Sequence, residues 1–521
     1  MPWQQVSPGR YERDFDSLEH FYRGIAAAGE PLRKQQYLIS GRIRLKSAPP
    51  VPQLQQAWKA LRHQYPQIAA VANEAGDKFV YTVPSPEALD AWLQETLIVD
   101  TSSSADSLYS TLTPSPIFKL YFLPHARELL FRTPHWRIDG IGLLHLQHAF
   151  LRLLAEGAPA EITFDGSEAA RLALSLDEAA SVPQEVTSEI SQAADAELGA
   201  FLAGQPAITI ATLSNQLPAA TQRYGISLPV DLSQRIIAAS KARGVHGHTR
   251  YTTTTRRRAA PRRKYTTLNV VDLRKYLPVP WNGSQAAVSV YHTGVPCTVD
   301  LDQHRHFTSI ATVLGAGYKR DLRKDEPRNM FGFLSEYVRK VLELLGATPD
   351  DLLEVPAHPQ LSSLGVINDY VQTRYEGKTA TVEVEDWWVA VEVANRLLQS
   401  YVWTWNGQLH LGVNYNEAFY ERSFVKQFVE EWKEVLVREL DCIYFTRVKN
   451  IEHGHDGILS FPGDTNAEVF TPGIPLRSGC GGRISAKSVV EDQRRQEEYG
   501  EGKDLEEKTG VDDLLSMVDL M

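Results

Sequence analysis

The sequence predicts a mixed α/β (α+β) protein made of two halves of similar size. Short apolar runs typical of strands alternate with segments of helical periodicity along most of the chain. Between residues 157 and 200 the composition changes to alanine, glutamate and serine with little periodic apolar content, which is typical of a linker. The 521 residues allow two to four domains, at about 150 residues per domain.

In the first half, residues 37–45 alternate apolar and basic side chains, a pattern that predicts a half-buried strand. Apolar residues then recur at helical spacing over 54–61. Two apolar runs at 117–123 and 129–133, separated by a proline and a histidine, predict a hairpin. After this hairpin, residues 143–154 place four leucines and a phenylalanine on one face of a helix.

The second half is expected to contain another hairpin, because the dipeptide Asn406-Gly407 lies between two apolar runs, 401–405 and 408–415. The remaining apolar segments predict buried strands and amphipathic helices. We expect strands at 268–273, 286–291 and 362–368, and helices at 331–345 and 424–440.

These elements suggest an N-terminal lobe (1–165), a linker with surface helices (166–205) and a C-terminal lobe (206–445). The remaining residues, 446–521, are rich in glycine and acidic residues and poor in aromatics, so we expect a disordered tail. Within the C-terminal lobe, residues 241–264 carry nine basic and no acidic side chains. We interpret this stretch as an exposed insert, and the functional alternative is a patch that contacts phosphate groups.

Charge and hydropathy exclude several classes of function. The net charge of −10 would repel a phosphate backbone, so we expect no nucleic-acid partner. No stretch approaches the roughly 18 apolar residues of a membrane helix, and the first residues do not form a signal peptide. The three cysteines lie far apart and predict neither a disulfide framework nor a metal site. We therefore expect a cytoplasmic monomer without a membrane span.

The run from Pro134 to Gly140 contains the most informative pattern, HxxxDG, formed by His135, Asp139 and Gly140. It follows a predicted strand and precedes a predicted helix. A histidine at a strand end can take a proton from a hydroxyl or an amine, and an aspartate four residues later can hold the loop by an internal ion pair. Glycine there permits close approach of the backbone to a ligand. This combination indicates acyl transfer.

Together with several other segments, this motif resembles the chloramphenicol-acetyltransferase-like acyltransferases, which include condensation domains of peptide synthetases. The likeness extends over residues 1–440 and is closest to the fungal trichothecene O-acetyltransferase branch. The Asp-Phe-Gly-Trp-Gly signature of the plant branch is absent. Besides the motif, the resemblance rests on Tyr11-Glu12-Arg13, Glu19-His20-Phe21-Tyr22, Asn269-Val270-Val271-Asp272-Leu273-Arg274, Tyr291-His292-Thr293-Gly294, Ser362-Ser363-Leu364-Gly365 and the Trp405 to Tyr420 segment.

The resemblance implies two lobes, each a mixed sheet covered by helices, with a tunnel between them. His135 would act as general base on the hydroxyl of a small-molecule acceptor, which attacks an acyl-CoA. Acyl-CoA is a co-substrate, and no bound cofactor is expected. Asp139 would pair with Arg274 to support the site, the alternative for Arg274 being a surface cation beside Asp272. Gly140 would keep the tunnel open beside the histidine.

We therefore predict an acyl-CoA-dependent O-acyltransferase, in particular an acetyltransferase, that modifies a secondary metabolite such as a terpenoid or polyketide, mycotoxins included. Two alternatives remain at this point: transfer from a carrier protein, with amide formation possible, and a remnant of the fold that only binds ligand. The second arises because the basic stretch 241–264 stands where relatives would have an alanine-rich helix. That stretch is either an adaptation or an error in the gene model.

Other residues that could carry chemistry are better explained by packing. His145 and His148 have a spacing that could hold a metal, but no cysteine or carboxylate completes such a site, so we expect no metal. The tryptophans are expected in the core or in hairpin pairs more than in contact with substrate. These are Trp387, Trp388, Trp403 and Trp405.

Overall fold

The computed structural model describes residues 2–442 with several short gaps, and these residues belong to one compact unit. The predicted tail at 446–521 and nearly all of the basic stretch at 241–264 lie outside the described residues. The residues left out within this span are 103, 214–215, 244–262, 324–328, 346–349, 351–356 and 358.

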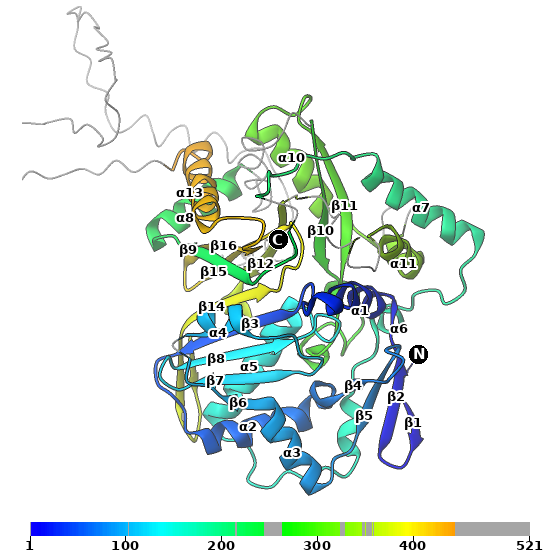
Figure 1. The fold of residues 1–521 in the computed structure, drawn as a ribbon, viewed down its shortest axis with the longest axis vertical. Helices are drawn as coiled ribbons and strands as arrows, with labels where there is room; N and C mark the ends of the chain where they lie inside the picture. The colour runs from blue at the N-terminus through cyan, green and yellow to red at the C-terminus, as the bar shows by residue number, and fades with distance from the viewer. Residues whose placement is uncertain are drawn as a thin grey trace, which may run out of the picture. The chain divides into compact units, whose positions relative to one another are not determined.

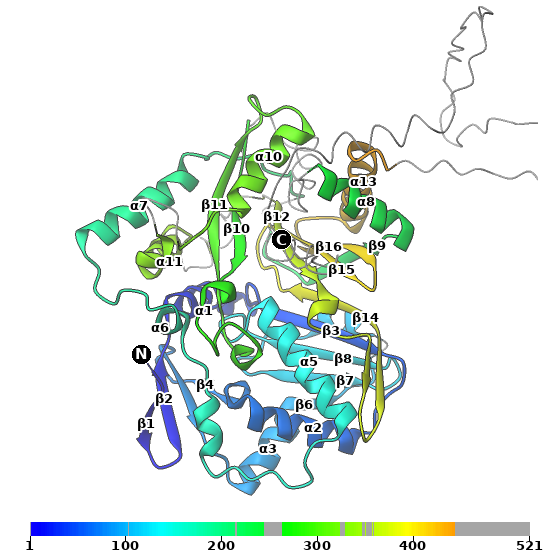
Figure 2. The ribbon, with the colours of Figure 1, turned by 180° about the vertical axis from the view of Figure 1, so that it is seen from behind.

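The fold is mixed α/β, as predicted, and its largest sheet has six strands (Figure 1). Helices α2 (Val51–Gln64) and α5 (Gly140–Glu156) pack against each other beside this sheet, and Figure 2 shows α5 lying across its strands. The strands, in spatial order, are β13 (Arg374–Glu376), β14 (Thr381–Val391), β3 (Ile39–Leu45), β8 (Glu128–Thr133), β7 (Lys119–Leu123) and β6 (Leu97–Val99).

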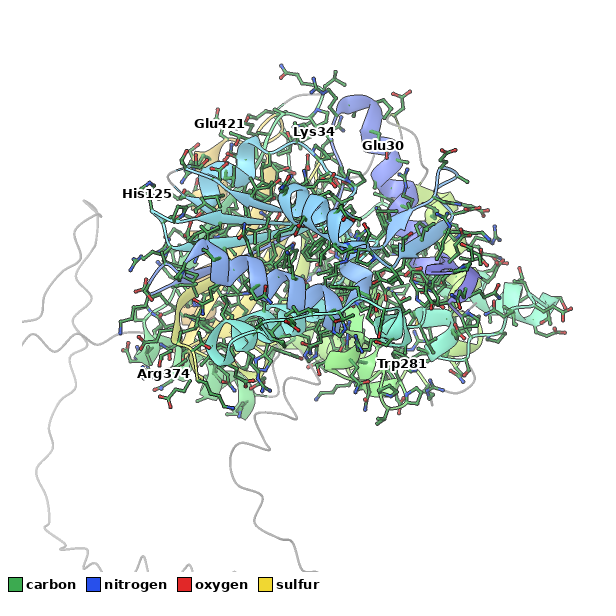
Figure 3. The ribbon with its side chains drawn as sticks, turned by 90° about the horizontal axis from the view of Figure 1, so that it is seen from below. Glu30, Lys34, His125, Trp281, Arg374 and Glu421 are labelled. Atoms are coloured by element: carbon green, nitrogen blue, oxygen red, sulfur yellow. The ribbon has the colours of Figure 1, made fainter. Side chains whose placement is uncertain are left out.

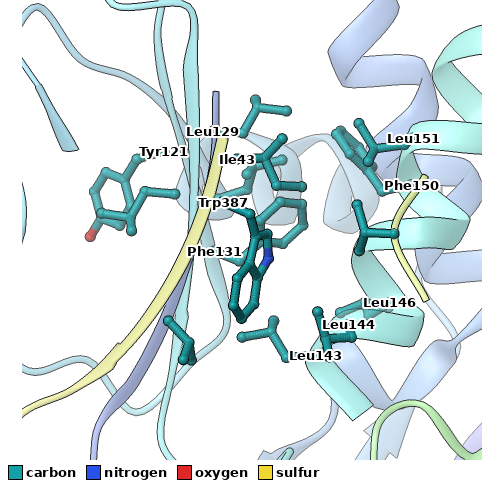
Figure 4. Packing of buried hydrophobic residues seen from close by; sticks show 14 of the residues in the cluster. Ile43, Tyr121, Leu129, Phe131, Leu143, Leu144, Leu146, Phe150, Leu151 and Trp387 are labelled. Carbon is teal, nitrogen blue, oxygen red and sulfur yellow. The ribbon is translucent and has the colours of Figure 1, made fainter. Parts of the chain in front are cut away.

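The core between this sheet and α5 is continuous. Figure 4 shows Ile43, Phe131 and Trp387 from three neighbouring strands facing Leu143 and Phe150 of α5. All five side chains are at most 1% exposed, so the leucine-rich face of α5 forms because it buries apolar surface against the sheet. In contrast, charged residues such as Glu30, Arg374 and Glu421 are exposed and project outward from the ribbon (Figure 3).

Strand β14 comes from the second half of the sequence but belongs to this sheet. It pairs antiparallel with β3, and Trp387 lies opposite Ile43. Since β3 pairs on its other side with β8, residues 381–391 cover an edge that the first half of the chain leaves open. The sheet therefore contains strands from both sides of the predicted linker.

The second half also forms a four-stranded sheet and a separate two-stranded one. Helices α8 and α13 contact strands of the first, while α10, α7 and α11 lie near the second. The four-stranded sheet is β12 (Pro359–Val366), β15 (Leu398–Trp405), β16 (Gln408–Asn416) and β9 (Thr221–Ser227), and the two-stranded one is β10 (Lys264–Asp272) with β11 (His292–Asp300). The helices are α7 (Ser188–Leu202), α8 (Val230–Ala242), α10 (Phe307–Tyr318), α11 (Leu334–Leu345) and α13 (Arg422–Glu439).

The remaining elements lie near the N-terminus and along the segment that follows α5. The remaining sheet has four strands in the order β1, β2, β5, β4. The bounds are β1 (Gln4–Ser7), β2 (Arg10–Asp14), β4 (Val71–Ala72), β5 (Lys78–Thr82), α1 (Ser17–Gly29), α3 (Pro86–Thr96), α4 (Ala105–Thr111) and α6 (Leu176–Ala179). None of the helices among the described residues has the length and apolar character needed to span a bilayer.

Both predicted hairpins are confirmed. Strands β7 and β8 pair antiparallel, as do β15 and β16. The turn of the second hairpin places Asn406 and Gly407 at φ of 48° and 75°, the left-handed conformation that this dipeptide accepts at little cost.

The strand predicted at 286–291 is wrong. The chain forms a short 3₁₀ helix, η5 (Ser284–Ala286), and then an irregular buried segment. Its backbone groups bond to the HxxxDG loop instead of to a strand: the Asp139 amide donates to the Ser289 carbonyl at 3.0 Å, and the Tyr291 amide donates to the Asp139 carboxylate at 2.7 Å. An apolar run predicts that a segment is buried but does not specify a strand. Here the segment is buried because it packs against the HxxxDG loop.

Candidate active site

The HxxxDG residues form the connection between β8 and α5. Strand β8 ends at Thr133, and α5 begins at Gly140 with Asp139 as its N-cap. The Asp139 carboxylate accepts a hydrogen bond from the Gly142 amide at 2.6 Å, which satisfies one of the free amides of the first helical turn. The motif therefore fixes where the helix starts and how the loop leaves the sheet.

Asp139 is also bonded to the second half of the chain. Its Oδ2 accepts hydrogen bonds from Arg274 Nη1 at 2.9 Å and from the Tyr291 amide at 2.7 Å. Burial favours a raised pKa, but Arg274 and the hydrogen bonds outweigh it, so the pKa of Asp139 lies below its ordinary value. The predicted ion pair is present, and Arg274 is 3% exposed, so the alternative of a surface cation is wrong. Arg274 also contacts Asp272 at 2.9 Å.

Two glycines of the motif region differ in the space around them. A Cβ on Gly140 would lie 3.3 Å from Leu364 Cδ2, a flexible side-chain end. A Cβ on Gly142 would lie 2.1 Å from the Ala287 carbonyl oxygen, which cannot move without shifting the buried segment. At Gly142 the backbone of the second half thus lies directly against α5, whereas a Cβ on Gly140 would meet only the end of one side chain.

The ring of His135 is half-buried and is held by an aromatic stack. It lies parallel to the ring of Tyr22 from α1, with centroids 4.2 Å apart and an interplanar angle of 6°. Its Nδ1 is buried and makes no hydrogen bond to another described residue. Burial lowers the pKa of His135 to about 4, against the opposing influence of its own backbone carbonyl and of Asp139. The imidazole is therefore neutral near pH 7 and able to accept a proton.

A second histidine stands beside the first. His292, at the start of β11, lies with its ring centroid 5.6 Å from that of His135, and its Nε2 is 3.1 Å from the Tyr22 hydroxyl. Burial, followed by the neighbouring His135, lowers the pKa of His292 to about 3. Both Tyr22 and His292 occur in segments that carry the family resemblance, but nothing in their spacing could reveal the contact, because 270 residues separate them.

These side chains border a cavity of about 280 Å³. Its walls come from both halves of the chain, including α1, the HxxxDG loop, β10, β11, α11 and β12, and they are mainly apolar and aromatic. A lining of this kind with a few convergent polar groups is typical of a small-molecule site. The residues used below that line it are Tyr22, His135, Gly140, Asp272, His292, Thr293, Ser363 and Leu364.

Known proteins similar to this chain show the family to which it belongs. No family model matches the chain. The acetyltransferase pigO of Monascus ruber is 32% identical over 464 residues, which cover 84% of this chain and 98% of that protein. The chain therefore belongs to the chloramphenicol-acetyltransferase-like acyltransferase family. The O-acetyltransferase pigM of the same organism is 26% identical, with coverage of 87% of this chain and 91% of that protein.

The fold of this acyltransferase is also found among solved structures. TRI3 trichothecene 15-O-acetyltransferase from Fusarium sporotrichioides superposes with a TM-score of 0.71 at 17% identity, covering 84% of this chain and 98% of that one. At this identity the likeness shows the shared fold alone. The chain is thus an acyltransferase by its relatives, and its mixed α/β structure has the fold of that family.

The two histidines of α5 and the four tryptophans singled out from the sequence do not line the cavity. His148 Nδ1 is 3.0 Å from the Tyr375 hydroxyl, and His145 packs edge-on against Tyr370. Within the described part of the chain, no group of three or more His, Cys, Asp or Glu side chains could hold a metal ion. The tryptophans at 387, 388, 403 and 405 are all buried in the hydrophobic core, and none of them lines the cavity.

Proposed function

We propose that this acyltransferase transfers an acetyl group from acetyl-CoA to a hydroxyl of an apolar secondary metabolite, with His135 as the general base. The observation that carries the proposal is the half-buried, neutral His135 ring at the wall of a cavity that both halves of the chain line. A neutral imidazole can accept the proton of a hydroxyl without first having to lose one.

In the proposed reaction, His135 takes the acceptor's hydroxyl proton as the oxygen attacks the thioester carbonyl. A carbon–oxygen bond forms, and the carbonyl electrons move onto oxygen to give a tetrahedral oxyanion. Collapse of that intermediate re-forms the carbonyl and breaks the carbon–sulfur bond. The thiolate leaves with the proton held by His135, so the products are the ester and free CoA thiol. Only the two substrates are consumed, and His135 returns to its neutral state.

The acceptor class follows from the cavity and from the relatives. A mainly apolar and aromatic wall favours an acceptor with a carbon skeleton and few charges. The relative pigM is named an O-acetyltransferase, and TRI3 acetylates a trichothecene oxygen, which supports a hydroxyl over an amine as the acceptor.

The test is release of free thiol from acyl-CoAs of increasing chain length, with and without a panel of terpenoid and polyketide alcohols. We expect thiol release from acetyl-CoA to be much faster when an acceptor is present, together with formation of the matching ester by mass spectrometry. Product formed from an acyl-carrier protein but not from any acyl-CoA would replace this donor by the carrier alternative. Tight binding of an alcohol without turnover by either donor would support a protein that only binds ligand.

A further inference from the structure

The contact between Tyr22 and His292 gives the cavity a hydrogen-bond donor next to His135. We propose that the Tyr22 hydroxyl donates a hydrogen bond to the oxyanion that forms on the attacked acyl group, and that His292 holds this hydroxyl in position. The inference rests on the proposed function, because it concerns the oxyanion of the same reaction. Tyr22 would be a catalytic residue, and His292 a positioning residue.

The Tyr22–His292 pair has two polar hydrogen atoms, and only one of them is needed for the hydrogen bond between the two residues. A neutral histidine carries one N–H and a tyrosine carries one O–H, and a single hydrogen bond joins Tyr22 Oη to His292 Nε2 at 3.1 Å. The Nδ1 of His292 is buried and has no hydrogen-bond partner among the residues that the structure describes. A proton on Nδ1 would therefore leave a buried N–H unpaired, whereas a proton on Nε2 is donated to the Tyr22 oxygen. In that arrangement the Tyr22 O–H is the free donor, and its oxygen is polarised by the bond that it accepts.

The pair keeps this donor over the whole working pH range. Burial, followed by the neighbouring Tyr37 and Asp139, raises the pKa of Tyr22 well above its ordinary value. Burial lowers the pKa of His292 to about 3. Neither group gains or loses a proton near neutral pH, so the donor is neutral and permanent, which is what a preorganised oxyanion site requires.

The location also fits. In the tetrahedral intermediate the oxyanion and the oxygen that was deprotonated by His135 are bonded to the same carbon, so a donor to the oxyanion must lie beside the His135 ring. Tyr22 is stacked on that ring with centroids 4.2 Å apart, and both Tyr22 and His292 line the cavity. Two other unpaired hydroxyls, of Thr293 and Ser363, also line it, but the structure gives neither of them a contact with His135.

The experiment compares Tyr22→Phe with Tyr375→Phe. Each variant removes one tyrosine hydroxyl that bonds to a histidine, at 3.1 Å for Tyr22 and 3.0 Å for Tyr375, but only the first residue lines the cavity. Phenylalanine keeps the stack on His135, so folding and ring position are preserved. We expect Tyr22→Phe to lower kcat by roughly 10²-fold with little change in either KM, because the donor acts on charge that develops in the transition state. Tyr375→Phe should leave kcat unchanged.

Two further measurements separate donation from positioning of the acceptor. Slow hydrolysis of acetyl-CoA in the absence of an acceptor passes through the same oxyanion, so Tyr22→Phe should slow it by the same factor as transfer. His292→Phe should lower kcat by a smaller factor, and His292→Gln, which retains an N–H, should recover part of that loss.

The outcomes distinguish failure of the proposed function from failure of the role inferred for Tyr22. Wild-type protein that releases no thiol from any acyl-CoA overturns the proposed function and this inference together. Normal turnover by wild type and by Tyr22→Phe overturns the inference alone, as does a kcat loss in Ser363→Ala or Thr293→Ala that Tyr22→Phe does not share. A Tyr22→Phe variant that loses transfer but keeps hydrolysis, with a raised acceptor KM, would show that the hydroxyl binds the acceptor instead of the oxyanion.

Discussion

The two ends of the HxxxDG loop have opposite surroundings, although His135 and Asp139 are only four residues apart. Asp139 has hydrogen bonds to both carboxylate oxygens, from Gly142, Tyr291 and Arg274. Within the described part of the chain, the buried Nδ1 of His135 has no hydrogen-bond partner in another residue, and the ring is held by a flat aromatic contact with Tyr22. One end of the loop is thus fixed by directional hydrogen bonds, and the other is held mainly by ring stacking.

The first prediction concerns His135, the end of the loop that ring stacking holds. His135→Ala should lower acyl transfer by roughly 10²- to 10⁴-fold, the range typical of a lost general base. Stability in urea should stay near that of wild type, because the ring leaves no hydrogen-bond partner behind. His148→Ala, which removes a half-buried histidine of α5 outside the cavity, is the control. Full turnover by His135→Ala would remove the histidine from the mechanism.

The second prediction concerns Asp139, the end of the loop that directional hydrogen bonds fix. Asp139→Ala should lower the free energy of unfolding by about 3–5 kcal/mol, because it leaves the buried Arg274 charge without this partner. Asp272→Ala is a matched control: its carboxylate contacts the same Arg274 nitrogen at the same 2.9 Å, but its side chain is 37% exposed. Its cost should be less than about 1 kcal/mol. Chemical denaturation measures both variants.

If Asp139→Ala were as stable as wild type and only catalytically impaired, the comparison would fail, since Asp139 would then act on His135 and not on the fold.

The third prediction compares the two glycines of the loop and helix start. Gly142→Ala should destabilise the protein by about 1–3 kcal/mol or more, because its Cβ would meet the Ala287 carbonyl oxygen at 2.1 Å. Gly140→Ala should keep the fold, since Leu364 can yield at 3.3 Å, and should raise the acceptor KM by narrowing the cavity. Thermal unfolding and steady-state kinetics test the pair. Equal destabilisation by both changes would contradict this distinction.

The fourth prediction concerns pH and has the smallest effect near neutrality. The pKa of His135 is lowered to about 4, so the base is unprotonated at neutral pH and becomes protonated only as pH falls through that value. The plot of kcat/KM against pH should be level from pH 8 to about 5 and decline below it. A decline centred near 6.5 would instead mean that the ring is solvated like a free histidine.

Local patterns and the family resemblance predicted several elements of the fold and the ion pair of Asp139. The loop, the helix that follows it and the Asn406-Gly407 hairpin all come from spacing and turn chemistry that act over a few residues. The pairing of Asp139 with Arg274 came from the resemblance, because no local rule links residues that far apart.

The rest depends on contacts between distant segments. The apolar run at 286–291 has the composition of a strand, but its backbone groups bond to the HxxxDG loop, and an apolar pattern does not say which groups take those bonds. Tyr22 and His292 belong to segments that carry the family resemblance, but the sequence analysis assigned them no role. Their contact forms only when α1 packs near β11 in the folded chain. The pairing of β14 with β3 likewise joins segments far apart in the sequence, and no local pattern specifies it.

The pairing of β14 with β3 has a consequence for biosynthesis. A ribosome releases β3 early and β13 and β14 only after most of the described chain has been made, so the large sheet lacks these two strands during much of translation. A truncated polypeptide that stops before residue 381 would expose the unpaired edge of β3 and lose Trp387 from its interior. Dividing the gene at the middle linker should therefore yield two insoluble products in place of two working halves.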